Sequence, residues 1–141
     1  MPELPEVETT RRGLAPHLIG RRLDTVRVRE PRLRWPVPPD FSQLLTGATL
    51  TDLRRRAKYL LFELATPHGG NGTLIAHLGM SGSLRLVPPA APLMTHDHVQ
   101  FRFAGAPELR LNDPRRFGSL HFTSESVDSH FLLAELGPEP L

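Results

Sequence analysis

The sequence predicts a mostly β protein of the α+β class, in which a two-layer antiparallel β-sandwich is flanked by helices. Three observations indicate this fold. The chain has 141 residues, of which 39% are hydrophobic, so one domain can bury a core without disulfides. Short runs of alternating hydrophobic and polar residues follow one another after residue 22, with turn residues between them. A helical pattern precedes these runs at the N-terminal end.

The helices are predicted from hydrophobic spacing and stop signals. Between Val7 and Leu18, hydrophobic residues recur at near-helical spacing with arginines between them, and Gly20 supplies a stop. Two shorter helices are expected over residues 40–45 and 129–136. The first helix would flank the sandwich and hold the N-terminal residues of the chain beside it.

The strands are predicted from period-two alternation. They are expected over residues 23–29, 50–64, 73–78, 83–87, 98–103, 109–112 and 119–122. Many short strands separated by turns are typical of an antiparallel sandwich or barrel.

The composition excludes several classes of site. The chain has no cysteine, which excludes disulfides, thiolate metal sites and cysteine nucleophiles. Its start shows neither the basic nor the apolar region of a secretion signal, and no apolar run approaches the length of about 18 residues that spans a bilayer. We therefore expect a cytoplasmic protein without a membrane partner.

The basic residues are sixteen arginines and a single lysine, Lys58, in a chain of net charge +2. Arginine makes bidentate contacts to phosphate and guanine, so this bias suits a nucleic-acid partner. An arginine-rich genome would produce the same ratio. Lys58 differs chemically from the arginines, because a primary amine can take part in acid–base chemistry that a guanidinium, with a pKa above about 12, cannot.

The first residues carry the elements of amine catalysis. Removal of the initiator methionine would expose the secondary amine of Pro2, which can attack the anomeric carbon of a sugar and form a cationic iminium. Glu3 and Glu6 follow, and either could move protons or orient this amine. Alternatively, both carboxylates only complement the positive end of the helix dipole.

Two further positions suggest phosphate contacts. Lys58 lies where a basic run passes into an apolar strand, so it could bind a phosphate, donate a proton or form only a solvated charge. The segment His96–Asp97–His98 is expected to place two imidazoles on the same face of a strand, but no third ligand is evident. A phosphate contact or ordinary surface polarity is therefore favoured there over a metal site.

Two turns carry side chains that could enter a base stack. Met80 lies in a glycine-bordered turn after His77, although a buried loop methionine would fit the same pattern. Arg115 and Phe117 lie in a second turn, and a hydrophobic wedge beside a cation suits the distortion of duplex DNA. Alternatively, Phe117 folds back into the core.

Together these segments resemble one family, the bacterial formamidopyrimidine-DNA glycosylases. The resemblance extends from end to end and rests on six ordered blocks, residues 2–9, 32–36, 55–60, 77–82, 96–98 and 113–118. Each block alone is a weak signal, whereas six in order are specific.

The resemblance implies a catalytic centre at the N-terminus. Pro2 would form a Schiff base with the deoxyribose, and Glu3 would be the main acid–base residue with Glu6 supporting both. Lys58 would lie near the damaged nucleotide and its phosphate and donate a proton during elimination. These residues would lie together at one arginine-rich edge of the sandwich.

The resemblance also implies the contacts to DNA. His77 and His96 would contact backbone phosphates. Met80 and Phe117 would fill and wedge the gap that the flipped lesion leaves, while Arg115 would pair with the estranged cytosine.

The implied activity is that of a bifunctional DNA glycosylase and abasic-site lyase in base-excision repair. Such an enzyme excises 8-oxoguanine and formamidopyrimidines through the Schiff base and then performs β,δ-elimination. Its partner would be double-stranded DNA containing oxidised purines or abasic sites, and it would act as a monomer.

The family continues into a helix-two-turn-helix domain and a four-cysteine zinc finger, which this sequence does not contain. We therefore expect residues 1–137 to form the catalytic domain and residues 138–141 to begin a linker toward that second half. The chain itself would hold no zinc or other cofactor, and its activity alone would be impaired.

Two alternatives stay open. The endonuclease VIII branch uses the same proline chemistry on oxidised pyrimidines, but Leu4, Met80 and residues 115–117 favour the purine-specific branch. The second alternative is a non-catalytic DNA-binding domain.

Overall fold

The computed structural model describes residues 4–125 and residue 130. Helices and strands follow one another as α1 (Leu4–Leu18), β1 (Leu23–Val28), α2 (Phe41–Leu45), β2 (Thr49–Arg56), β3 (Tyr59–Ala65), β4 (Asn71–His77), β5 (Ser83–Val87), β6 (Asp97–Phe103), β7 (Glu108–Asn112) and β8 (Ser119–Thr123). No helix in this part of the chain is both long and apolar enough to cross a membrane.

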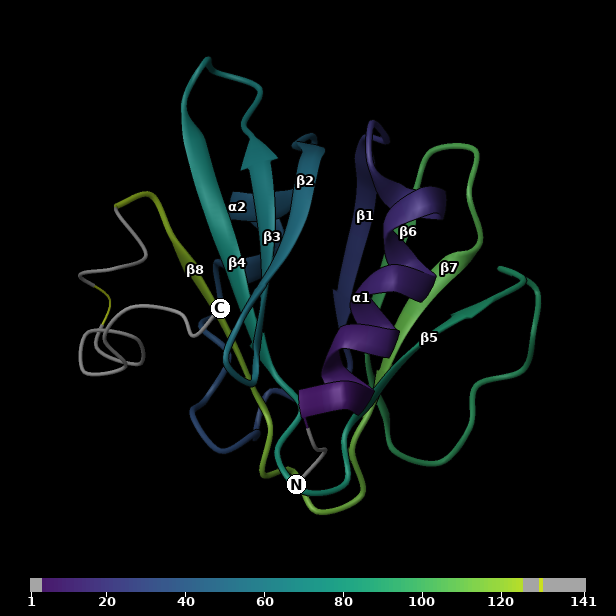
Figure 1. Ribbon diagram of the computed structural model, residues 1–141. Helices are drawn as coiled ribbons and strands as arrows, with labels where there is room; N and C mark the ends of the chain where they lie inside the picture. The colour runs from purple at the N-terminus through teal and green to yellow at the C-terminus, as the bar shows by residue number, and fades with distance from the viewer. Residues whose placement is uncertain (1–3, 126–129, 131–141) are drawn as a thin grey trace.

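The strands form two four-stranded sheets in two layers (Figure 1). One sheet has the order β1-β6-β7-β5 and the other the order β2-β3-β4-β8, and all neighbouring strands are antiparallel. Helix α1 packs against β2 beside the gap between the sheets. The predicted fold class, an α+β protein built on a two-layer antiparallel sandwich with flanking helices, is confirmed.

One predicted strand is wrong in extent. The run over residues 50–64 is a hairpin of β2 and β3, in which Arg56 pairs with Tyr59 and only two residues form the turn. Ala57 makes this turn possible by adopting a φ of +52°, a conformation that alanine rarely takes. The turn carries no Gly, Asn or Asp, so the usual sequence signal is missing.

The helix predictions have three outcomes. Helix α1 buries Val7, Leu14 and Leu18 as the spacing predicted, and complete burial of a leucine such as Leu18 contributes about 2 kcal/mol. The expected helix over residues 40–45 is α2, which buries Phe41 and Leu45. The helix expected over residues 129–136 lies outside the described residues.

Several connections converge at one end of the sandwich, which we call the loop end. It comprises the turn at residues 57–58 and the loops at residues 78–82 and 113–118. The two loops cross between the sheets, from β4 to β5 and from β7 to β8. Helix α1 begins at the same end, at the bottom of Figure 1. The antiparallel register of the two sheets therefore brings together segments far apart in the sequence.

Candidate active site

The first predicted site residues lie at or before the start of α1. Glu6 is exposed in the first turn of the helix, at the loop end, where the sequence predicted it. Pro2 and Glu3 lie outside the described residues. Their predicted meeting with Lys58 therefore stays a prediction.

Lys58 lies in the tight turn between β2 and β3, and an ionic contact joins this turn to helix α1. The Arg55 guanidinium donates a hydrogen bond to the Ala57 carbonyl oxygen at 3.0 Å and another to a Glu8 carboxylate oxygen at 3.2 Å. Because Glu8 belongs to α1, a single side chain links the helix to the turn that presents Lys58. The helix and the lysine are thereby held at one end of the sandwich.

Sequence reasoning did not single out Glu8. Its spacing from Arg11 and Arg12 indicates only surface pairs on a helix. In the structure Glu8 accepts hydrogen bonds from both arginines as well as from Arg55, and these contacts, that of Arg11 foremost, lower its pKa to about 2. Glu8 is therefore ionised at physiological pH.

His77 ends strand β4 beside the aromatic ring of Tyr59, with 4.9 Å between the ring centroids. Its Nδ1 accepts a hydrogen bond from the Gly79 amide at 3.1 Å. Burial lowers the pKa of His77, and the charges of Lys58 and Arg34 lower it further. His77 is therefore neutral at physiological pH, with its proton on Nε2, where it can donate to an anion.

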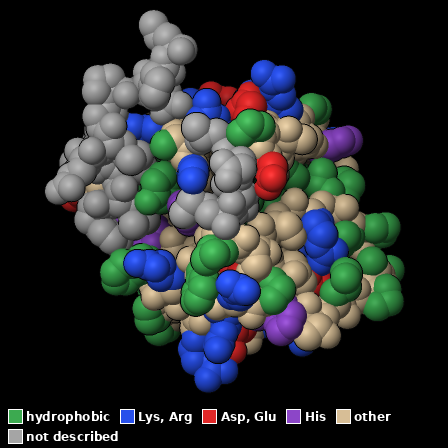
Figure 2. Space-filling view, turned by 60° about the horizontal axis from the view of Figure 1, so that its bottom comes forward, with side chains coloured by type: hydrophobic (Ala, Val, Ile, Leu, Met, Phe, Trp, Pro, Cys, Tyr) green, Lys and Arg blue, Asp and Glu red, His purple; other side chains and the backbone are tan. Residues whose placement is uncertain are grey.

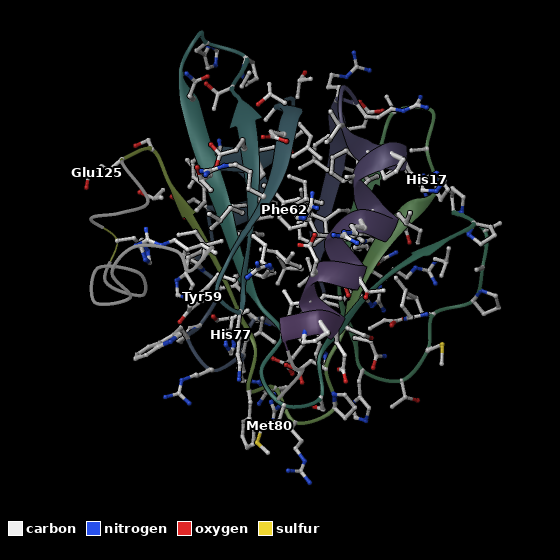
Figure 3. The ribbon with its side chains drawn as sticks, in the orientation of Figure 1. His17, Tyr59, Phe62, His77, Met80 and Glu125 are labelled. Atoms are coloured by element: carbon white, nitrogen blue, oxygen red, sulfur yellow. The ribbon has the colours of Figure 1, made fainter. Side chains whose placement is uncertain are left out.

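A pocket of about 520 Å³ opens at the loop end. Its described lining is aromatic and basic, without an acidic side chain, and consists of Arg34, Trp35, Tyr59, His77, Gly79, Met80, Phe117 and Ser119. Figure 3 shows Tyr59, His77 and Met80 following one another toward this end. Such a lining suits a ligand that has both a flat ring and negative charge.

Trp35 and Arg34 join the site from a segment that the sequence analysis used only as part of the resemblance. The Arg34 guanidinium lies 5.8 Å from the centroid of the Trp35 ring, and its backbone amide donates to the Gly118 carbonyl oxygen at 3.1 Å. The backbone bond fixes this segment to the loop at residues 113–118. The only sequence signal for Arg34 and Trp35 was their place in residues 32–36, one of the six blocks that resemble the family.

The side chains predicted to wedge DNA project from the surface. Met80 is 53% exposed and Phe117 is 45% exposed, so neither folds into the core. Arg115 is exposed in the same loop as Phe117. Exposed large hydrophobic side chains beside a cation mark a surface suited to binding.

The two histidines near residue 97 have different environments. His96 is exposed just before β6 and has a φ of +73°, whereas His98 is buried with its Nε2 2.8 Å from the Asp113 carbonyl oxygen. Their ring centroids are 5.9 Å apart. No group of three or more metal-ligating side chains occurs within residues 4–125. His98 therefore supports the fold, and His96 is the histidine that can reach a ligand.

Comparison with known proteins shows which family this chain belongs to. Residues 1–120 match the family model described as the formamidopyrimidine-DNA glycosylase N-terminal domain. The chain belongs to the formamidopyrimidine-DNA glycosylase family. A relative of that name from Methylococcus capsulatus is 62% identical and one from Thioalkalivibrio sulfidiphilus is 59% identical, each over all 141 residues. The chain spans about half the length of these relatives, 50% in both cases.

Solved structures of the family have the same fold. The Lactococcus lactis glycosylase bound non-covalently to DNA containing an abasic site superposes with a TM-score of 0.86 at 37% identity, covering 99% of this chain and 52% of that one. A complex of the L. lactis protein with DNA and an inhibitor gives a TM-score of 0.77 at 37% identity, covering 86% and 43%. The sandwich is therefore the fold of the N-terminal half of this family.

The surface of the family domain at the loop end is mixed in character. Figure 2, which turns this end forward, shows Lys and Arg side chains interspersed with hydrophobic ones. Arg34 and Arg115 belong to this basic set, and Met80 and Phe117 to the hydrophobic one. Cations can neutralise backbone phosphates while the hydrophobic groups contact bases.

Proposed function

We propose that this chain is the catalytic half of a bifunctional DNA glycosylase and abasic-site lyase of base-excision repair. Its substrates would be 8-oxoguanine and formamidopyrimidines in double-stranded DNA, together with abasic sites. One observation carries the proposal, the convergence of Lys58, His77, Met80 and Phe117 on the end of the sandwich where helix α1 begins.

The chemistry begins at the N-terminal amine. The amine nitrogen of Pro2 attacks C1′ of the damaged nucleotide, the glycosidic bond breaks, and the base leaves with a proton. Loss of the amine proton and opening of the sugar ring give a cationic iminium, with Glu3 as the acid–base residue and Glu6 in support. A base then removes a C2′ proton, and the released electron pair converts the iminium to an enamine. The enamine returns this pair to form a C2′–C3′ double bond as the C3′–O bond breaks, so the 3′-phosphate departs and the iminium is restored. A second elimination releases the 5′-phosphate.

Lys58 is suited to assist these eliminations. Its turn is held by Arg55, and its ammonium group contributes positive charge near His77. A lysine in this position stabilises a departing phosphate and supplies a proton to it.

The remaining residues bind and distort the duplex. His77 would donate its Nε2 proton to a phosphate, and exposed His96 would contact a second one. Met80 and Phe117 would occupy the stack where the damaged nucleotide has left it, and Arg115 would bond the estranged cytosine. Unstacking costs a few kcal/mol, which contacts to the distorted duplex offset.

The proposed reaction does not require a cofactor. The amine, the carboxylates and Lys58 supply every proton transfer, so the chain would act without a metal of its own. We further propose that it acts as a monomer in the cytoplasm. The oxidised-pyrimidine branch is the second substrate class that an excision assay should include.

Borohydride trapping on a duplex with one abasic site tests the amine chemistry. We expect a covalent adduct whose peptide map places the DNA on Pro2, because borohydride reduces an iminium to a stable amine. A chain that retains Met1 is the matched control, since its proline nitrogen is then an amide. Lys58→Arg keeps the charge and should still trap, while strand cleavage slows by roughly 10²-fold or more.

If an adduct forms, two results would still contradict the proposal. The first is equal trapping by the chain that retains Met1. The second is an adduct that maps to Lys58, which would make the lysine the nucleophile.

A further inference from the structure

The two loops that carry Met80 and Phe117 pack backbone against backbone. A Cβ placed on Gly79, whose φ is +63°, would lie 2.6 Å from the Gly118 nitrogen. A Cβ placed on Gly118 would lie 2.6 Å from the His77 carbonyl oxygen. Only glycine permits so close an approach at these two positions. The loops therefore form one continuous surface.

Asp113 joins the two loops from the inside. Its side chain is fully buried, at 0% exposure. One carboxylate oxygen accepts a hydrogen bond from the Ser81 hydroxyl at 2.8 Å, and the other accepts one from the Gly118 amide at 2.8 Å. The Ser81 oxygen lies in turn 3.3 Å from the Arg115 amide, which donates to it. A single carboxylate thus contacts both loops.

The backbone of Asp113 reaches a third segment. Its amide donates to the His96 carbonyl oxygen at 3.1 Å, and its own carbonyl oxygen lies 2.8 Å from Nε2 of buried His98. Between these histidines, the Asp97 carboxylate accepts a hydrogen bond from the Asn112 side chain at 3.0 Å. The segment that presents His96 is therefore fixed to the same buried residue.

We propose that Asp113 is a positioning residue for DNA distortion. Its carboxylate holds Met80 and Phe117 at a set spacing before DNA binds, so that the two side chains enter the base stack as one unit. A wedge that is already ordered avoids the loss of entropy that two mobile loops would suffer on binding. This inference rests on the proposed function, in which both side chains enter the stack.

The loop link can be tested without DNA. Ser81→Ala removes one donor to the carboxylate and leaves the core intact, whereas Asp113→Asn keeps the shape but replaces one accepting oxygen. We expect amide hydrogen exchange at Gly118 to accelerate about tenfold in both variants. Asp113→Asn weakens the acceptor of the Gly118 amide, and Ser81→Ala removes the second hydrogen bond that holds that acceptor in place. Ser42→Ala, in α2, is the matched serine control and should leave Gly118 unchanged.

The positioning role needs a readout on DNA. A 2-aminopurine opposite an abasic-site analogue reports unstacking by its fluorescence, measured at saturating protein and low salt. We expect Ser81→Ala to lose most of the fluorescence rise. The effects of Met80→Ala and Phe117→Ala on this fluorescence rise should be strongly non-additive in the unmodified chain. In the Ser81→Ala variant the two effects should be close to additive.

The outcomes separate the inference from the proposed function. The inference is overturned if Ser81→Ala behaves like Ser42→Ala in both measurements, or if exchange accelerates throughout the core with a fall in global stability. If the unmodified chain neither traps DNA nor gives a fluorescence rise, the proposed function fails. In that case, faster hydrogen exchange at Gly118 alone would still support the link that Asp113 makes between the two loops. Unchanged exchange at Gly118 would refute that link.

Discussion

His121 is a titratable residue that the proposed chemistry does not use. It belongs to β8, pairs in register with Ile75, and lies 5.4 Å from the His130 ring, centroid to centroid. Burial, with a further effect of His130, lowers the pKa of His121 to about 4. The folded chain therefore holds this imidazole neutral over a pH range in which the unfolded chain protonates it.

This difference predicts a loss of stability in mild acid. The contribution of His121 is complete above pH 6.5 and is lost as the pH falls from 6.5 toward 4, because the unfolded state binds the proton first. The loss amounts to at most about 3 kcal/mol. Urea denaturation at pH 7.5 and pH 4.5 should show it, and His121→Gln should flatten the dependence. His68→Gln, which changes a histidine in an exposed turn, should leave the pH dependence of stability as it is. If the stability of His121→Gln still falls as steeply between pH 7.5 and pH 4.5, the assignment is refuted.

Neutral His77 has a different consequence at the residue scale. Its Nδ1 is occupied by the Gly79 amide, so Nε2 carries a proton without positive charge. The proposed phosphate contact from His77 would therefore not require acid.

At the scale of elements, the joint between α1 and the β2–β3 hairpin matters most for the site. The Glu8 carboxylate forms an ion pair with Arg55 of β2 and also pairs with Arg11 and Arg12 of its own helix. The Arg55 side chain then supports the turn at Ala57. The Glu8 carboxylate thus helps to hold the start of α1 beside the turn that carries Lys58.

Glu8→Gln should loosen this joint. We expect a loss of about 1 kcal/mol or less in global stability, as for surface ion pairs, but clearly faster hydrogen exchange in α1. Because the pKa of Glu8 is lowered, its contribution is present above pH 4.5 and is lost as the pH falls toward 2. The difference between Glu8→Gln and the unmodified chain should therefore vanish in strong acid.

Glu30→Gln is the matched control for this prediction. Glu30 is also ion-paired, with Arg32, and its pKa is also lowered to about 2, mainly by that arginine. Glu30 also lies 3.8 Å from the Arg116 guanidinium, and neither arginine belongs to α1, so its loss should leave exchange in α1 unchanged. Equal acceleration of α1 in both variants would show that Glu8 does not couple helix and hairpin.

At the scale of the whole molecule, the chain carries the proposed DNA-binding surface at its loop end and spans about half the length of the relatives it matches. Phosphate neutralisation supplies most non-specific affinity and falls steeply with salt. The cost of unstacking must be offset by contacts to a bent duplex, and a smaller protein surface offers fewer of them.

We therefore expect this chain to bind abasic, 8-oxoguanine and undamaged duplexes weakly and with similar affinity. Raising the salt from 50 to 200 mM should weaken binding by roughly tenfold or more. Titration of all three duplexes at both salt concentrations measures this. A large, salt-insensitive preference for 8-oxoguanine opposite cytosine would instead mean that this half recognises damage alone.

The sequence predicted most of the fold because periodicity reports burial directly. The spacing from Val7 to Leu18 predicted α1, and period-two runs predicted strands that agree with the structure within two residues, apart from one. That exception, the turn at Ala57, depends on a left-handed alanine. Such a conformation is imposed by the pairing of β2 with β3 and has no local signal.

The site was predictable by residue type but not by arrangement. One lysine, two histidines and two hydrophobic turn residues could be named from their local patterns and their resemblance to one family. Their supports could not: Glu8 resembles an ordinary helix-surface residue, and Asp113 an ordinary turn residue. Both acquire their roles from partners distant in the chain, Arg55 for Glu8 and Ser81 for Asp113.

The sequence by itself determined the fold class, the α1 and α2 helices, most strand positions and the family, because these depend on local periodicity and ordered motifs. Only the tertiary structure decided that Phe117 projects outward, that His98 is buried while His96 is exposed, and that Asp113 joins both wedge loops. The physical reason is that burial and hydrogen-bond partners at a loop are set by whichever segments the sheet register brings beside it. That register is a property of the assembled sandwich.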